Sequence, residues 1–557
     1  MSNSEIAEII EFTGKLLTLH DLDENKARLY TGLSFGLDKL EDDLAGMDEA
    51  ELLKVRGIGK SLVKTIQEII QRGSSAELDD LVSQTPDGVL EMFKVKGIGV
   101  KKIKALWQEH GIDNLNDLQI ACESGKIAGM KGFGEKTQQG ILESLVFLKQ
   151  QSGKLRMNQG QELSAQILEV LNQNFEEVIE VGAVPRKLET VDALGFLIAS
   201  DFSDKAKLDA DFKEDMKLSS PFIWRGRYQG NKVMVEIQFT EKKEFGKQQL
   251  ISNAAIEHLN YVSPSKGKFI HFIKGQYLDS EQDFYEAFDS PYVIPEMREG
   301  LGEFDWVKNN SNDDLITWES LKGCLHNHSK YSDGKNTLKE MADACKALGM
   351  EYFGIADHSQ TASYANGLIA GRVVQQQTEI DELNKAYSGF KILKGIESDI
   401  LSDGSLDYDK DILETFDYVV ASVHANLDMD INKATDRLLK AIENPYTTIL
   451  GHPTGRLLLA RKGYPIDYKK IIDACVANRV VMEINASPYR LDLDWRWIPY
   501  CLEKGVMLSI NPDAHKIEGL YDMHYGVAVA RKAGLTKDMT FNAMSLTEMQ
   551  KYLNAKS

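Results

Sequence analysis

The pattern of apolar and polar positions changes twice along the chain. Over residues 1–150, apolar residues recur at helical spacing, with short interruptions of one kind. Residues 155–310 mix helical patterns with strands such as 233–239. After residue 320, seven short apolar runs alternate with helical patterns. Such alternation predicts an α/β barrel built on a parallel sheet.

Two polar segments divide this pattern into domains. Residues 150–154 (Gln-Gln-Ser-Gly-Lys) are typical of a linker, and residues 308–314 (Lys-Asn-Asn-Ser-Asn-Asp-Asp) of a domain boundary. At roughly 150 residues per domain, a chain of 557 residues should hold three or four domains. We therefore expect helical regions over 1–88 and 89–150, a mixed domain over 151–312, and the barrel over 320–557.

The interruptions in the first 150 residues share the form apolar-basic-Gly-apolar-Gly. They occupy 55–59, 95–99 and 130–134, and a helical stretch follows each of them. Glycine ends many ordinary helices, which is the simpler alternative. Three copies spaced 35 to 40 residues apart favour helix-hairpin-helix motifs instead. In such motifs backbone amides approach a phosphate, and the next helix directs its N-terminus towards it.

Charge supports phosphate binding only in this region. The chain has 65 basic and 85 acidic residues, a net charge of −20, so the whole surface cannot attract nucleic acid. Residues 51–150 contain 14 basic and 13 acidic residues, a balance of +1. Backbone-phosphate contacts carry no sequence information, so we expect sequence-independent DNA binding. The predicted DNA contacts are Gly57, Gly59, Lys60, Gly97, Gly99, Lys101, Gly132, Gly134 and Lys136.

Other features of the sequence indicate a cytoplasmic protein. No run reaches the ~18 apolar residues that a membrane helix requires. The N-terminus lacks a basic region followed by an apolar core, so it does not resemble a signal peptide. Five scattered cysteines show neither metal-type pairing nor a disulfide framework. We expect a cytoplasmic protein that does not bind membranes and that is a monomer.

Side chains with metal-binding chemistry follow the apolar runs of the C-terminal region. Seven of the 11 histidines lie after residue 321, and six of them stand at the ends of runs. A (β/α) barrel carries its active site at these strand ends. A single histidine there is usually structural, but six together are difficult to explain in that way. With three carboxylates they give nine candidate ligands: His326, His328, Asp333, His358, Glu397, His424, His452, Asp513 and His515.

Nine ligands are too many for one ion and fit two or three. Imidazole and carboxylate ligands suit Zn, Mn or Fe, and Mg remains open; we favour Mn. Clustered ions can clamp a phosphoryl group, generate hydroxide near neutral pH and stabilise the leaving oxygen. Arg456 follows His452 by four residues and either meets a substrate phosphate or forms a surface salt bridge.

The C-terminal motifs resemble those of the PHP (polymerase and histidinol phosphatase) domain over about residues 320–557. The resemblance implies a distorted (β/α)7 barrel that holds up to three metals and hydrolyses phosphoesters. It also implies that Glu397 bridges two ions, and that Glu397, Asp513 and His424 are catalytic. The matching segments are His326-Asn327-His328 with Ser332-Asp333-Gly334, Ala356-Asp357-His358, Gly395-Ile396-Glu397, Gly451-His452-Pro453 and Asp513-Ala514-His515.

The order of the domains resembles that of the bacterial family X DNA polymerases. Residues 294–300 (Ile-Pro-Glu-Met-Arg-Glu-Gly) also resemble the segment that enters the last domain of that family. The resemblance implies a first helix-hairpin-helix in 1–88, a fingers-like region in 89–150, and a polymerase palm and thumb in 151–312. It associates the PHP domain with 3′–5′ exonuclease activity and related processing of DNA ends.

The polymerase motifs of this family are degenerate in the chain. A palm needs three carboxylates to hold two Mg²⁺ ions. With Glu189-Thr190-Val191 setting the register, two of these positions fall on Ala193 and Gly195, and the third falls on Glu236. The triphosphate-binding Gly-Ser has become Gly182-Ala183, and Asn253-Ala254-Ala255 replaces Thr-Gly-Ser. Another register, in which Asp192 or other residues serve, remains the alternative.

Lyase activity is also not expected. The Schiff-base lysine of family members with this activity corresponds to Thr65, and the neighbouring Lys64 is rotated by about 100° on a helix. The sequence thus predicts a DNA-binding phosphoesterase with an inactive palm. One alternative is an active polymerase with an attached exonuclease. Another is a non-enzymatic scaffold in DNA repair, although an intact ligand set argues against it.

Overall fold

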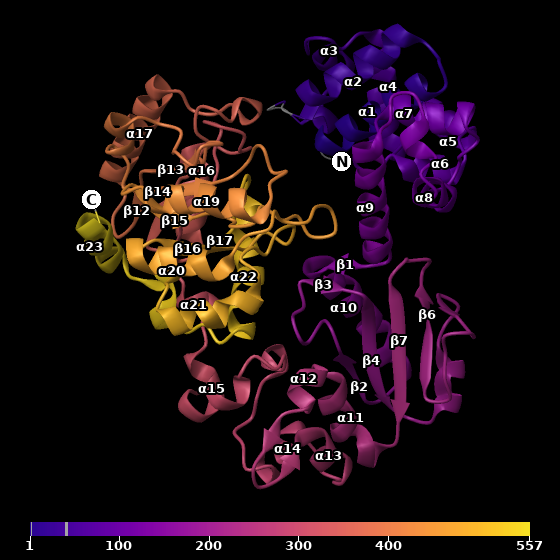
Figure 1. Cartoon of the computed structure of the whole chain (residues 1–557), viewed down its shortest axis with the longest axis vertical. Coiled ribbons are helices and arrows are strands. Elements are labelled where there is room, and N and C mark those ends of the chain that lie inside the picture. The colour runs from indigo at the N-terminus through magenta and orange to yellow at the C-terminus, as the bar shows by residue number, and fades with distance from the viewer. Residues whose placement is uncertain (2, 39, 41–42, 557) are drawn as a thin grey trace. The chain divides into compact units, whose positions relative to one another are not determined.

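The computed structural model describes every residue except 2, 39, 41–42 and 557 (Figure 1). It divides into two compact units, Met1–Ser152 and Gly153–Ser557. Among the described residues, no helix has the length and apolarity needed to cross a membrane.

The first unit is built from helices around one apolar core. Ile10, Leu62, Ile66, Ile103 and Ile141, from four different helices, are buried in it. The helices are α1 (Asn3–Leu19), α2 (Glu24–Asp38), α3 (Glu49–Leu52), α4 (Lys60–Arg72), α5 (Ala76–Ser83), α6 (Asp87–Met92), α7 (Val100–Lys104), α8 (Leu115–Glu123) and α9 (Glu135–Gln151).

The linker between the units is shorter than the sequence predicts. Helix α9 continues through Gln150 and Gln151, which the polar pattern assigns to the linker. Glutamine is a good helix former, so its polarity does not end a helix. Gly153, at a φ of +80°, follows the helix, and β1 begins at Leu155. Only residues 152–154 separate α9 from the next element.

The second unit begins with a five-stranded mixed sheet whose strand order is β2-β4-β7-β6-β5. Strand β4 runs parallel to β7, and the other pairs are antiparallel. The predicted strand 233–239 is β7, and its alternate residues Val235, Ile237 and Phe239 are buried. The elements are β1 (Leu155–Arg156), α10 (Met157–Asn174), β2 (Val178–Val181), β3 (Thr190–Val191), β4 (Ala193–Ala199), β5 (Phe212–Glu214), β6 (Ile223–Tyr228) and β7 (Met234–Thr240).

A small, mostly helical region follows this sheet. Its core contains Phe269, Phe284, Tyr285 and Phe288. Its elements are α11 (Phe245–Ser252), α12 (Ile256–Leu259), β8 (Val262–Ser263), β9 (Gly267–Lys268), α13 (Phe269–Lys274), α14 (Glu281–Ala287) and α15 (Glu303–Asn309).

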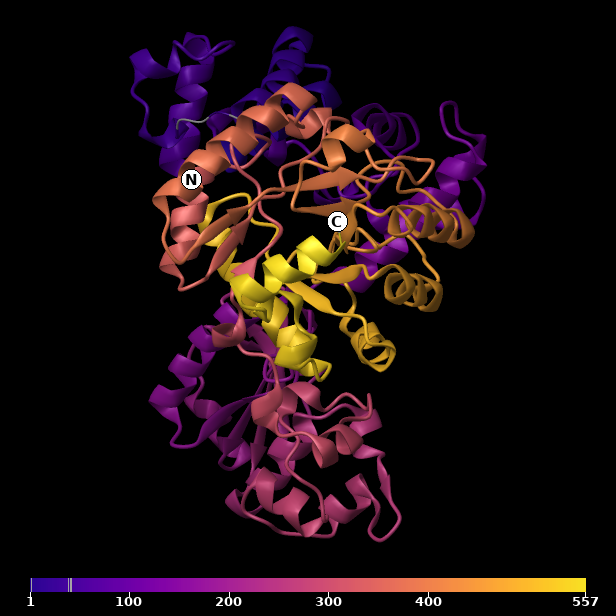
Figure 2. The same cartoon turned by 90° about the vertical axis from the view of Figure 1, so that its left-hand side faces the viewer.

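All paired strands of the C-terminal region are parallel, and helices surround them (Figures 1 and 2). They form a sheet of order β10-β11-β12 and another that runs from β13 to β17. Two isolated bridges, Asn327 to Ala514 and His358 to Glu397, join segments that follow or belong to these sheets. The strands are β10 (Gly323–Cys324), β11 (Tyr352–Gly354), β12 (Lys391–Leu393), β13 (Gly395–Asp399), β14 (Tyr418–Ser422), β15 (Thr447–Leu450), β16 (Val481–Asn485) and β17 (Leu508–Asn511).

The seven predicted apolar runs coincide with these eight strands, with two differences. The run 391–396 is divided into β12 and β13, which belong to different sheets. Glu397 lies inside β13 and not after its end, because the strand continues through Ser398 and Asp399. Strand β13 pairs with β14 on one side, and on the other side the Glu397 amide donates to the Asp357 carbonyl oxygen while the Glu397 carbonyl oxygen accepts from the Ser359 amide. The backbone of Glu397 is therefore satisfied while its side chain is buried. The helices are α16 (Leu338–Ala347), α17 (Ala370–Ala386), α18 (Lys410–Leu413), α19 (Ile431–Ile442), α20 (Tyr468–Asn478), α21 (Ile498–Lys504), α22 (Met523–Lys532) and α23 (Leu546–Lys556).

Buried polar contacts join the parallel-strand region to the region before it. The Lys532 ammonium on α22 is fully buried and pairs with Glu299. It also donates to the carbonyl oxygens of Arg186 (2.8 Å) and Glu296 (3.3 Å). Burial lowers the pKa of Lys532 to about 8, against the opposing effect of Glu299. These contacts explain why residues 153–557 form one unit.

Candidate functional site

Glu397 lies at the centre of a cluster of histidines. Its side chain is 1% exposed, and each of its carboxylate oxygens faces more than one ring. Such a shared carboxylate is the arrangement in which one ligand serves two cations. Its oxygens lie 2.9 Å from His358 Nδ1, 3.0 Å from His452 Nε2, 3.2 Å from both His326 Nε2 and His424 Nε2, and 3.7 Å from His328 Nε2.

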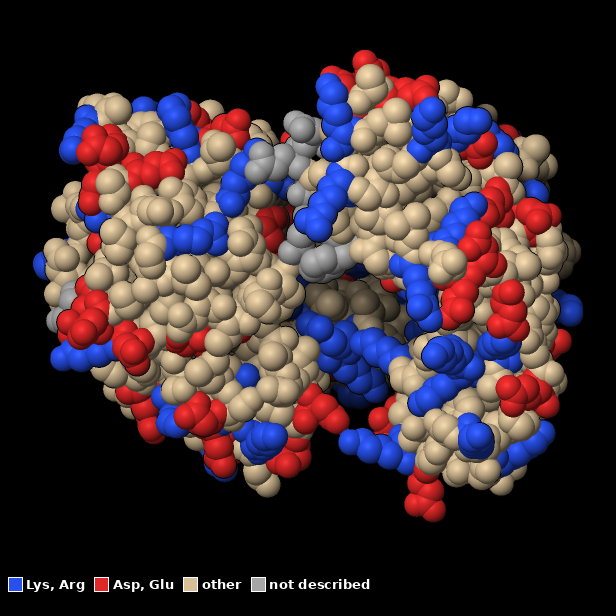
Figure 3. Space-filling view, turned by 90° about the horizontal axis from the view of Figure 1, so that it is seen from above, with Lys and Arg blue, Asp and Glu red and all other residues tan. Residues whose placement is uncertain are grey.

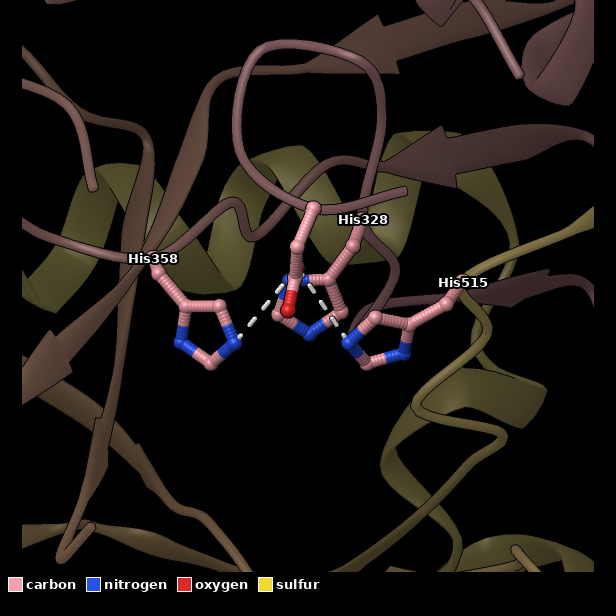
Figure 4. Close-up of side chains that lie close together, drawn as sticks. His328, His358 and His515 are labelled. Carbon is pink, nitrogen blue, oxygen red and sulfur yellow. Dashed lines mark ion pairs between the residues drawn. The ribbon is translucent and has the colours of Figure 1, made fainter. Parts of the chain in front are cut away.

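Two further carboxylates extend the cluster. Asp513 Oδ1 lies 3.1 Å from His328 Nε2. Asp333 Oδ1 lies 3.4 Å from His515 Nε2 and 3.7 Å from His358 Nε2. The rings of His328, His358 and His515 converge from three separate segments (Figure 4). All nine residues predicted as ligands therefore meet in one place.

Three overlapping groups in the cluster have the geometry that a metal ion requires. The ligand atoms within each group lie within 4.8 Å of one another. His328 belongs to two groups and His358 to two, so the groups share residues. They are His328-Asp333-His358-His515, His326-His328-Asp513 and His358-Glu397-His424.

Several buried polar atoms of the cluster have no hydrogen-bond partner in the part of the chain that the structure describes. Two of them, His358 Nδ1 and Glu397 Oε2, are 2.9 Å apart. The others are His326 Nε2, His328 Nδ1 and His452 Nδ1. A buried polar atom without a partner costs about 1–3 kcal/mol. Divalent ions would satisfy such atoms, so the donor set fits the metals that the sequence implies.

The charges of the cluster are strongly coupled. Burial opposes ionisation of Glu397, but His424, His326 and His358 outweigh it and hold the pKa of the carboxyl well below its usual range. Burial, with His515 and His358, lowers the pKa of His328 to about 3. Against burial, Glu397 and Asp399 raise the pKa of His424 to about 10. Because a metal ligand must be an ionised carboxylate or a neutral imidazole, His424 would release a proton when an ion binds.

Two acidic residues orient the histidines, and sequence reasoning missed both. Asp399 Oδ1 lies 2.5 Å from His424 Nδ1, and Glu483 Oε1 lies 2.7 Å from His326 Nδ1. A carboxylate on the second ring nitrogen fixes the tautomer and orientation of a metal-binding histidine. The signals were present: Asp399 is two residues from Glu397 on the same strand, and Glu483 interrupts an apolar run.

The arginine near the cluster is not the one that the sequence suggests. Of its two proposed roles, Arg456 has the salt bridge, because its Nη1 lies 2.9 Å from Asp494. Arg490 instead approaches the cluster, with its Nε 3.4 Å from Asp513 Oδ2. Asp357, next to His358, accepts hydrogen bonds from Ser329 and shapes the loop after β10.

The three glycine turns of the first unit have the same backbone conformation. Gly57, Gly97 and Gly132 have φ values of +92°, +87° and +85°. The second glycine of each turn is the extended N-cap of the following helix, α4, α7 or α9. Lys60, Lys101 and Lys136 are exposed in the first turns of these helices. The repeat thus presents three similar helix N-termini with a basic residue beside each.

Basic and acidic side chains are interspersed on the face that Figure 3 draws, in agreement with the mixed composition.

The positions relevant to lyase activity lie on α4. Lys64 is exposed there, and the Thr65 hydroxyl is 3.3 Å from that of Tyr30.

The proposed palm positions line a cavity of about 480 Å³ in the mixed sheet. Gly195 of β4 stands opposite Glu236 of β7, as the predicted register requires. A Cβ atom on Gly195 would lie only 2.7 Å from the carbonyl oxygen of Val181 on β2. The lining includes Gly182, Ala183, Ala193, Gly195 and Glu236.

Each acidic residue of this cavity has a cationic partner. Glu236 Oε1 is 2.6 Å from Arg225 Nε, and Asp192 is 3.2 Å from Lys154 Nζ. Glu189 pairs with Arg496 at 2.8 Å and accepts a hydrogen bond from Trp495 Nε1 at 2.7 Å. The cavity therefore contains carboxylates that are already neutralised.

Comparison with known proteins agrees with the histidine cluster and with the glycine turns. Residues 325–487 match the PHP domain family, and residues 89–146 match the SAM-like helix-hairpin-helix tandem. The chain is therefore a PHP-domain protein with a helix-hairpin-helix region. Probable phosphatases of Thermoanaerobacter sp. (strain X514) and Caldanaerobacter subterraneus subsp. tengcongensis are 30% and 25% identical to it, over 31% and 40% of this chain and 72% and 86% of theirs.

One relative aligns over the whole chain. The DNA polymerase/3′-5′ exonuclease PolX of Bacillus subtilis (strain 168) is 32% identical over 580 aligned residues, which cover 99% of each protein. The chain belongs to the PolX family. This membership and the phosphatase-like relatives support a DNA-binding hydrolase of the PHP type.

Proposed function

We propose that this protein is a DNA-end-processing 3′–5′ exonuclease whose hydrolytic centre is the histidine cluster around Glu397. The observation that carries this proposal is the carboxylate of Glu397, which five histidines share in a fully buried position. No fold-stabilising role requires so many unsatisfied ring nitrogens in one place. The exonuclease name of the full-length relative favours DNA as the substrate.

The nine clustered residues would hold two or three divalent ions, with Mn favoured. When bound, such ions supply Lewis-acid stabilisation of a phosphoryl group and lower the pKa of water. In the hydrolysis, water adds to phosphorus and the phosphorus–oxygen bond to the next nucleotide breaks. The proton from water ends on the leaving oxygen. Glu397, Asp513 and His424 would contact the reacting groups or their ions, while Asp399 and Glu483 hold the rings in orientation.

The architecture proposed for this activity is a distorted (β/α)7 barrel over 320–557. Strands β12 and β13 are separated only by Lys394, so they count as one of seven strands. The bridges from Asn327 to Ala514 and from His358 to Glu397 support closure of the barrel. Residues 151–312 would be a palm and thumb, with the helix-hairpin-helix regions at 1–88 and 89–150.

The glycine turns would bind DNA through its phosphates, without sequence preference. Backbone amides at helix N-termini are of the kind that bind phosphate, and the three turns present three such N-termini. Family membership supports DNA as the ligand. We further propose that the protein acts in the cytoplasm as a monomer.

The palm is proposed to be inactive, because Ala193 and Gly195 cannot ligate Mg²⁺ through a side chain. The second candidate is an active polymerase, which the name of the full-length relative favours. Primer extension with dNTPs and Mg²⁺ or Mn²⁺ separates the two. Extension that survives Glu236→Ala would place the polymerase site elsewhere.

Hydrolysis of end-labelled DNA by the metal-loaded protein tests the main proposal. Chelator should abolish hydrolysis, and added Mn²⁺ should restore it. His328→Ala should bind less metal and lose hydrolysis by orders of magnitude while its circular dichroism is unchanged. His524→Ala is the matched control, because His524 is exposed and stacks on Trp318, 3.9 Å between ring centroids. Equal rates for His328→Ala and the parent would refute the proposal.

A further inference from the structure

An exposed tyrosine lies beside the histidine cluster. Tyr364 lies in the 3₁₀-helical turn Ser363–Ala365, and 49% of its surface is exposed. Its ring centroid is 6.2 Å from that of His358. Burial, followed by the charges of Asp399, Glu397 and Asp333, raises the pKa of the Tyr364 hydroxyl, and Arg490 opposes them. The ring therefore lies beside a histidine of the cluster, while part of it faces solvent.

A guanidinium group with spare hydrogen-bonding capacity stands at the same cluster. Arg490 Nη1 is buried and has no hydrogen-bond partner among the described residues. Burial and then the charge of Arg490 lower the pKa of Arg461, which donates to the carbonyl oxygen of Gly455. Two guanidinium groups close enough to repel one another would be stabilised by an anion. The planar donors of arginine match the oxygens of a phosphate.

We propose that the entrance to the cluster binds a single-stranded DNA terminus, with the terminal base stacked on Tyr364 and the scissile phosphodiester held by Arg490. This inference rests on the proposed function and names its substrate class. A base of a single strand can leave its neighbours and stack on an aromatic ring, whatever its identity. A base at a fully paired end must first unpair and unstack, which costs a few kcal/mol.

Variants of Tyr364 test the stacking. We expect Tyr364→Ala to lower kcat/KM for a single-stranded oligonucleotide about tenfold more than for bis(p-nitrophenyl) phosphate, a phosphodiester without bases, both with Mn²⁺. Tyr364→Phe should restore the parent ratio, because a phenyl ring also stacks. The control is Tyr521→Ala: Tyr521 is exposed to a similar extent, 54%, and its ring lies 6.4 Å from that of Trp318.

An abasic terminus gives a readout that a structural role would not change. The parent should cleave an oligonucleotide with a terminal abasic residue about tenfold more slowly than the normal one. Tyr364→Ala should not distinguish the two substrates. It should also lose the preference of the parent for single strands over paired ends.

The phosphate contact predicts a different result for Arg490. Arg490→Lys should raise KM about tenfold for both the oligonucleotide and the base-free diester, at an unchanged metal content. A loss of metal instead would mean that Arg490 only positions Asp513. A Tyr364→Ala rate on single strands equal to that of the parent, or equal losses on both substrates, would overturn the stacking. If the parent hydrolyses neither substrate, the proposed function itself fails.

Discussion

The cavity lined by the proposed palm positions, called the palm cavity below, and the histidine cluster both contain carboxylates of the second unit, but the partners of these carboxylates differ. In the palm cavity Glu189, Asp192 and Glu236 each have a cationic partner. In the cluster the partners are mainly histidines, and Glu397 Oε2 and several ring nitrogens have no hydrogen-bond partner among the described residues. The two groups of acidic residues thus differ in the kind of partner: arginine or lysine in the first, and mostly histidine in the second.

This difference distinguishes carboxylates that are paired with permanently charged side chains from carboxylates whose partners are themselves potential metal ligands. A carboxylate paired with arginine has its charge balanced and gains little from an added ion. A buried polar atom without a partner is costly, and an ion removes that cost. The degree of internal pairing therefore indicates metal binding better than the number of acidic residues does.

The largest expected effect comes from removing one charge at the centre of the cluster. Glu397→Gln should lower DNA hydrolysis by a factor of about 10³ or more, because loss of metal-held charge stabilisation removes several kcal/mol from the transition state. Glu236→Gln in the palm should leave hydrolysis at the parent rate. Both rates and the bound metal should be measured. Equal behaviour of the two variants would contradict the distinction between the two sites.

The ion pair of Glu189 should contribute to the free energy of unfolding of the second unit. Burial would raise the pKa of its carboxyl, but Arg496 and Arg456 outweigh it and lower the value from 4.5 to about 2. A depressed pKa stabilises the folded state above pH 4.5, and the contribution is lost as the pH falls towards 2. Glu189→Gln should therefore lower the free energy of unfolding by about 3 kcal/mol near pH 7. The gap from the parent, measured by urea unfolding, should close in acid; a constant gap would contradict the ionic pairing.

Introducing an aspartate at the two proposed palm positions should destabilise the protein at Gly195 but not at Ala193. Gly195→Asp should lower stability by about 1–3 kcal/mol, because its Cβ would meet the Val181 carbonyl oxygen at 2.7 Å. Ala193→Asp is its matched control, since alanine already has a Cβ at that position. Thermal unfolding of both variants measures the difference. Neither substitution alone should give primer extension.

The smallest effects are expected in the first unit. Lys60→Glu, Lys101→Glu and Lys136→Glu should each weaken DNA binding and reduce the salt dependence of log K by about one unit. Gly57→Ala, Gly97→Ala and Gly132→Ala should also weaken it, because φ values near +90° are unfavourable for alanine. Arg28→Glu, a reversal of an exposed charge on α2, is the control. Binding titrations at several salt concentrations report the slope, and unchanged slopes would mean that the turns only end helices.

The sequence predicted the elements of this fold well where a local pattern determines them. The apolar runs coincide with β10 to β17, and the three glycine turns precede α4, α7 and α9. Helix α9 extends past the predicted linker because polarity and helix propensity are different properties. Glu397 lies inside its strand because only pairing with neighbours defines a strand end.

Contacts between distant segments could not be predicted in the same way. Arg456 and Arg490 both follow strands, and only the folded chain shows that the second approaches Asp513. The crowding of Gly195 by Val181 depends on the antiparallel register of β2 and β4. The convergence of nine residues was predicted from spacing, but the role of Asp399 and Glu483 in orienting rings was not.

The buried ammonium of Lys532 limits how this chain can be rearranged in evolution. A fragment that starts at residue 320 would lack Arg186, Glu296 and Glu299. These residues supply the hydrogen-bond acceptors of Lys532 described in the fold. These residues also help to bury Lys532, so in the fragment its ammonium would meet water in place of its present partners. The parallel-strand region of this chain has therefore adapted to the region before it, and a gene fusion that transfers it alone would expose a surface that is now an interface.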